Sequence, residues 1–124
     1  MNILDNRVAR HRRHREERQR YLAELELLAQ RMRSDGGRLR AEIEQAVKLG
    51  NPASAQPLLQ RHGQLARSLA AVEGQIAAAG DALAVADREL KRHELAAAQR
   101  ADNAGGPDGR RPSRAGPAFP SRGS

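Results

Sequence analysis

The segment Gly50-Asn51-Pro52-Ala53-Ser54-Ala55-Gln56-Pro57 interrupts an otherwise helix-forming chain of 124 residues. Gly50 suits the left-handed position just after a helix end. Two prolines so close together cannot continue a helix interior, although Pro57 fits the first turn of a helix capped by Ser54. The segment therefore predicts a short turn, at about residues 50–55, between two helices that fold back on each other.

Heptad spacing flanks this turn on both sides. Before it, the positions spaced alternately by four and three residues are Leu4, Val8, His11, Arg15, Arg18, Leu22, Leu25, Ala29, Met32, Gly36, Leu39, Ile43 and Ala46. After it, the positions with the same spacing are Leu58, His62, Leu65, Leu69, Val72, Ile76, Ala79, Leu83, Ala86, Leu90, His93 and Ala97. Each series keeps its phase for about six heptads, more than the three or four that indicate a coiled coil.

These patterns predict an all-α fold, an antiparallel coiled-coil hairpin over residues 1–100 with helices at about 3–49 and 56–100. Centring the turn near Ala53 and Ser54 places Gly36 opposite Val72. Asn2 is the expected cap of the first helix. Residues 101–124 contain twelve Gly, Pro or Ser among 24, so we expect a disordered tail rich in Gly, Pro and Arg.

The composition disfavours an enzyme or a cofactor-binding protein. Aromatic residues make up 2% and cysteine is absent, so large aromatic core residues and thiolate sites are lacking. A two-helix hairpin offers no pocket that could tune catalytic groups. Four histidines occur, but Arg neighbours would repel a metal ion, so we expect no metal and no cofactor.

The sequence also predicts where the protein is located. The N-terminus has no apolar secretion signal, and no run approaches the ~20 apolar residues that span a bilayer. We therefore expect a soluble cytoplasmic protein without a transmembrane segment.

Positive charge is concentrated at the start of the chain. The net charge is +7, and residues 1–20 hold seven Arg against three acidic residues. His11, Arg15 and Arg18 occupy heptad positions that apolar residues would normally fill, which predicts a loosely packed basic end that binds a partner. Apolar residues outside the two heptad series add to this candidate surface. The predicted partner-binding residues are Arg10, Arg12, Arg13, Arg15, Arg18, Tyr21, Leu27, Val85, Lys91, Arg92 and Leu95.

Three stretches carry a family resemblance. They are the Arg-rich opening from Arg10 to Arg20, the segment Gln60-Arg61-His62-Gly63-Gln64-Leu65 through Ile76, and the charged stretch Ala86-Asp87-Arg88-Glu89-Leu90-Lys91-Arg92-His93-Glu94-Leu95. With the hairpin architecture, they resemble the small coiled-coil proteins of bacterial flagellar and type III secretion export, the FliJ/YscO type. The likeness covers residues 1–100; the Gly/Pro/Arg tail and the glycines of the second helix depart from it.

The resemblance implies a non-enzymatic cytosolic component of the export apparatus, peripheral to the inner membrane. Members of that family act as an ATPase-associated stalk or a chaperone escort. Its implied partners are the hexameric export ATPase, the export gate and substrate chaperones, with the basic end entering the ATPase ring.

Two other functions fit the residues. Outward apolar side chains would suit a homodimerising coiled-coil scaffold. The Arg cluster would suit a basic coiled coil associated with nucleic acid, although the chain lacks aromatics for base stacking and any groove-reading module.

Overall fold

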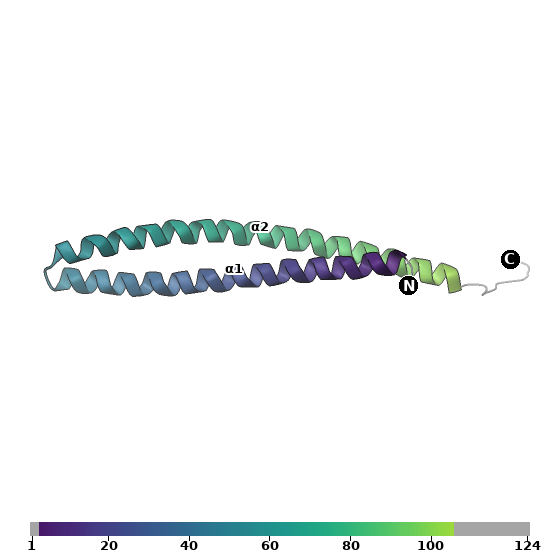
Figure 1. Ribbon diagram of the computed structural model, residues 1–124, viewed down its shortest axis with the longest axis horizontal. Helices are drawn as coiled ribbons and strands as arrows, with labels where there is room; N and C mark the ends of the chain where they lie inside the picture. The colour runs from purple at the N-terminus through teal and green to yellow at the C-terminus, as the bar shows by residue number, and fades with distance from the viewer. Residues whose placement is uncertain (1–2, 106–124) are drawn as a thin grey trace, which may run out of the picture. The chain divides into compact units, whose positions relative to one another are not determined.

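The computed structural model describes residues 3–105 and confirms the predicted all-α hairpin. Helix α1 spans Ile3–Lys48 and helix α2 spans Pro52–Gly105 (Figure 1). The chain divides into two compact units. The terminal unit comprises residues 3–16 and 85–105 of the described chain, and the turn unit comprises residues 17–84. Each unit pairs a segment of α1 with a segment of α2.

A network of backbone hydrogen bonds closes α1 at the turn. Gly50 has a φ of 69°, the left-handed conformation expected for it. Its N–H donates to the Val47 carbonyl, and the Asn51 N–H donates to the Ala46 carbonyl, both at 3.0 Å. These two bonds form a Schellman motif, which satisfies carbonyls that the helix end leaves without partners.

Helix α2 begins earlier than the sequence predicted. The Ser54 N–H donates to Asn51 Oδ1 at 3.3 Å, so Asn51, rather than Ser54, caps the helix. Pro52 then takes the first helical position, where its missing N–H removes no helical bond. The predicted helix start near residue 56 was therefore wrong. The sequence contains two residues that can cap this helix, Asn51 and Ser54, and the structure uses the first of them.

The shorter turn changes the pairing between the helices. A Cβ built at Gly36 would lie 3.7 Å from Leu65 Cδ2, so Gly36 faces Leu65 and not the predicted Val72. Since α2 starts at Pro52, the turn is centred near Gly50 and Asn51. At Gly36, the pairing therefore lies closer to the turn than predicted.

Both units bury their heptad positions. The core of the turn unit consists of Leu25, Ala29, Val72 and Ala79, with Leu22, Met32, Leu69 and Ile76 packed against it. The terminal unit buries Val8, Ala86 and Leu90. Of the heptad positions whose exposure is described, all but Arg18 are buried or half-buried. The predicted seam is therefore confirmed within each unit.

Helix α2 differs from the prediction at its other end as well. It continues to Gly105, so residues 101–105 are helical rather than part of the tail. The remainder of the predicted tail and the predicted cap Asn2 lie outside the described residues.

By length and composition alone, α2 is long and apolar enough to cross a membrane. A helix of a soluble protein can meet the same criterion.

Replacement of Gly50 by Ala should destabilise the hairpin. The backbone at φ 69° strains any residue with a Cβ, so we expect the free energy of unfolding to fall by about 1–2 kcal/mol. Gly37→Ala is the matched control. Gly37 lies inside α1 with open space around its Cβ position, and the substitution should raise the free energy of unfolding by up to about 1 kcal/mol.

Urea denaturation followed by circular dichroism measures both changes. An unchanged midpoint for Gly50→Ala would show that the left-handed turn contributes nothing to stability.

Candidate partner-binding site

Acidic side chains of α2 neutralise several of the predicted basic contacts. In the terminal unit Arg12 pairs with Glu94 at 3.2 Å, and Arg15 pairs with Asp87 at 2.9 Å. Lys91 also reaches Asp87, at 3.1 Å, so this carboxylate lies between two cations. Arg92 pairs with Glu89 at 3.1 Å, one turn away on the same helix. Four of the predicted partner-binding residues therefore hold ion pairs within the unit.

Arg10 and Arg13 differ from these four residues in their ion pairing. Both are exposed, and neither forms an ion pair with another described residue. Arg7, which the sequence analysis did not select, is exposed on the same stretch of α1. Residues 3–16 hold five Arg against two acidic residues, whereas residues 85–105 hold four basic and four acidic residues. The positive surplus of the terminal unit consequently belongs to α1.

Two histidines occupy the seam of the terminal unit. The rings of His11 on α1 and His93 on α2 stack with centroids 4.1 Å apart and planes inclined by 18°. Both side chains are half-buried. Burial lowers the pKa of His11, and the nearby His93, His14 and Arg10 lower it further, against the opposing effect of Glu89. The seam of the terminal unit therefore includes a stacked pair of imidazole rings.

Asp87 connects the seam to the basic surface. Its hydrogen bonds from Lys91 and then Arg15 lower the pKa of the Asp87 carboxyl below its ordinary value. Arg15 enters the seam at a heptad position while its guanidinium bonds this carboxylate. The stem of Arg15 can thus cover apolar surface while its charge stays paired. Arg15 acts in holding the two helices together.

The remaining predicted residues belong to both units. Arg18, Tyr21 and Leu27 lie in the turn unit, where Tyr21 is 46% and Leu27 56% exposed. Val85 and Leu95, in the terminal unit, are 49% and 61% exposed. The exposure expected for these apolar residues is confirmed. A common surface formed by Tyr21, Leu27 and Val85 stays a prediction, because these residues belong to different units.

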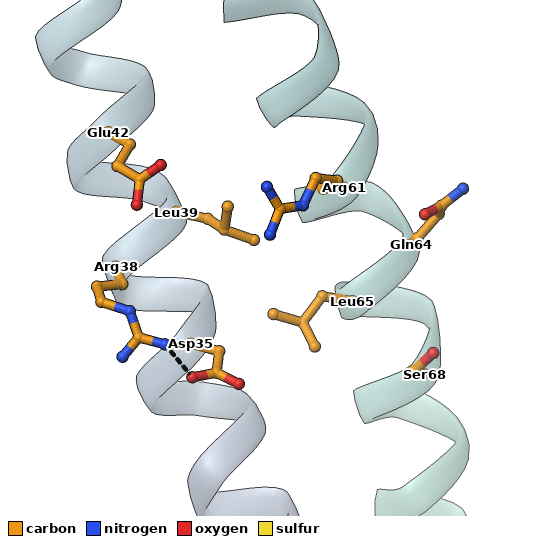
Figure 2. Close-up of a pocket in the computed structure, with 8 residues that line it drawn as sticks. All are labelled: Asp35, Arg38, Leu39, Glu42, Arg61, Gln64, Leu65 and Ser68. Atoms are coloured by element: carbon orange, nitrogen blue, oxygen red, sulfur yellow. Dashed lines mark hydrogen bonds and ion pairs between the residues drawn. The ribbon is translucent and has the colours of Figure 1, made fainter.

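The turn unit has an open groove of about 350 Å³ between α1 and α2 (Figure 2). Leu39 and Leu65 extend into the space between the helices, while Asp35 and Arg38 pair with each other on α1. The other residues that line the groove are Glu42, Arg61, Gln64 and Ser68.

Within residues 3–105 no three His, Asp or Glu side chains gather closely enough to hold a metal ion.

Comparison of the chain with protein-family models, with curated proteins and with solved structures finds no match. The resemblance to the flagellar and type III export proteins consequently stays a prediction from the sequence.

Lowering the pH from 7 to 5 should destabilise the terminal unit through His11. Its pKa is lower in the folded protein, so the unfolded chain binds the proton more readily. The stabilisation is present above the ordinary histidine pKa of about 6.5 and is lost as the pH falls through the folded value. Asp87, whose pKa is also lowered, stabilises the fold above its ordinary range near pH 4 and loses this effect at still lower pH.

NMR titration of the histidine ring protons measures the effect directly. His93→Gln should raise the pKa of His11, because it removes the neighbouring imidazole. His14→Gln, at an exposed position of the same helix, is the control and should change the pKa of His11 less. A His11 pKa at or above 6.5 in the wild type would contradict this prediction.

Proposed function

We propose that the chain is a non-enzymatic, partner-binding component of the flagellar or type III protein export apparatus. It would act in the cytosol as an ATPase-associated stalk or chaperone escort, peripheral to the inner membrane. The observation that best supports this proposal is the division of basic residues in the terminal unit. Some hold the two helices together, while Arg10 and Arg13 remain exposed without an acidic partner among the described residues.

The paired residues explain how the surface keeps its form. Arg12–Glu94 and Arg15–Asp87 both join α1 to α2. Exposed ion pairs contribute little stability each, but these two act beside the buried Val8 and Leu90. The unpaired guanidinium groups are thereby carried on a helix that is already folded, so less conformational entropy is lost when a partner binds.

The unpaired residues indicate the chemistry of the partner. Arg10 and Arg13 are three residues apart on an exposed part of α1, with Arg7 one turn before Arg10. Guanidinium groups bind carboxylates in a bidentate manner, and clustered positive charge speeds encounter with an acidic surface. An acidic protein surface would supply the counter-charges that this chain itself supplies to Arg12 and Arg15.

The family resemblance supplies the identity of the partners. It makes the hexameric export ATPase the first candidate, with the export gate and substrate chaperones as further ones. A basic helical hairpin whose exposed arginines meet acidic groups on a ring of subunits would fit the stalk role. No catalytic step is assigned to the chain.

Reversing the charge of Arg10 and Arg13 should abolish partner capture. The wild-type chain, immobilised as bait in native cell extract at moderate salt, should retain the export ATPase, and the purified ATPase should hydrolyse ATP faster when the chain is added. The double variant Arg10→Glu/Arg13→Glu should lose both effects, and raising the salt concentration should weaken wild-type capture.

Arg31→Glu/Arg40→Glu is the matched control. These two arginines are also exposed on α1, but they lie in the turn unit, so this variant should behave as the wild type does. Recovery of nucleic acid instead of the ATPase, or of the chain itself alone, would contradict the proposal. Equal loss of capture in both double variants would contradict the assignment of the site to the terminal unit.

A further inference from the structure

The outer face of α2 in the turn unit has an unusual distribution of charge. It lies on the side of the helix away from the stripe that packs on α1, which includes Leu69, Val72, Ile76 and Ala79. The residues of this outer face are all exposed, and they follow heptad spacing of their own: Arg67, Ala70, Ala71, Gly74, Ala77, Ala78 and Asp81. Charge occurs only at the two ends of this set, with opposite signs.

The exposed side of α1 in the same unit provides a contrast. It carries charged residues along its length, including Arg20, Glu24, Arg31 and Arg38. Such a face is what solvent favours on an amphipathic helix. The outer face of α2 carries alanine and glycine between its two end charges and so lacks this distribution of charge.

The charges of this outer face are symmetric about Gly74. Arg67 precedes Gly74 by seven residues, and Asp81 follows it by seven. The alanines also match, since Ala70 mirrors Ala78 and Ala71 mirrors Ala77. Two copies of this face related by a two-fold axis through Gly74 would therefore place each Arg67 level with Asp81 of the other copy, twice.

Both end charges are available for such a contact. Neither Arg67 nor Asp81 forms an ion pair with any other described residue, although Glu73 nearby is paired with Arg33 of α1. The centre of the face is also open, because a Cβ built at Gly74 would meet nothing within 4 Å. Gly and Ala side chains let two helices approach closely.

We propose that a second copy of this chain docks antiparallel on the outer face of α2, with Gly74 against Gly74 and Arg67 of each copy paired with Asp81 of the other. This interface lies in the turn unit and does not depend on the proposed function of the terminal unit. Charge complementarity favours a second copy over a lipid bilayer, since insertion would remove Arg67 and Asp81 from water without a partner.

Sedimentation equilibrium over a range of protein concentrations tests the proposal. The wild type should show a dimer mass at high concentration. Arg67→Asp or Asp81→Arg alone places like charges together twice in the dimer and should raise the dissociation constant about tenfold. The double variant Arg67→Asp/Asp81→Arg restores opposite charges and should return the dissociation constant to near the wild-type value.

A steric variant and a control complete the test. Ala78→Glu should abolish the dimer while leaving the helical circular dichroism spectrum unchanged, because Ala78 is exposed. Arg31→Asp makes the same charge change on α1 as Arg67→Asp makes on α2, and should leave the dimer intact. A wild type that stays monomeric throughout, or a dimer insensitive to the charge reversals and to Ala78→Glu, would overturn the proposal. So would a monomer that binds neutral lipid vesicles and loses that binding with Ala78→Glu.

Discussion

Within residues 3–105, each unit confines its burial to the seam between its two helical segments, and the other features described above depend on that constraint. Each helix can cover only a single stripe of its surface, so the core is a line of residues rather than a three-dimensional cluster. Leu25 and Val72 remain 7% and 8% exposed, whereas Ala29 reaches 0%. Small residues at some heptad positions bring the helices close together and reduce the apolar area that each layer buries.

The constraint also decides how polar residues enter the seam. The rings of His11 and His93 stack across the helices, and Arg15 keeps its charge paired with Asp87. A polar group in so narrow a seam remains partly hydrated, so its burial is less costly than in a globular core. The terminal unit is thereby ordered without an aliphatic residue at every heptad position.

A protein built this way presents its chemistry on outward surfaces. The terminal unit offers guanidinium groups of α1, including Arg10 and Arg13, and the turn unit offers the weakly charged outer face of α2. The two proposed contacts differ in kind: the first would rest on charge that acts over a distance, and the second on close packing and two matched charges. Under the two proposals, a protein partner would bind the terminal unit and a second copy of the chain would bind the turn unit.

The candidate site was only partly predictable. Clustered Arg residues near the N-terminus identified the basic region, because charge can be counted without knowing the fold. Which Arg residues are free could not be known in advance. The acidic partners Asp87, Glu89 and Glu94 lie on α2, and their reach depends on the register of the two helices. The stacking of His11 on His93 depends on the same register.

Sequence by itself determined the hairpin, its seam and the segment in which the turn lies. Heptad periodicity specifies which stripe of a helix is buried, and Gly50, closely followed by Pro52, favours a break between two helices. Tertiary structure decided the cap, the start of α2 at Pro52 and the pairing of Gly36 with Leu65. The physical reason is that a heptad pattern repeats every seven residues. Apolar stripes therefore match in several registers, and the hydrogen bonds that close the turn help to select one of them.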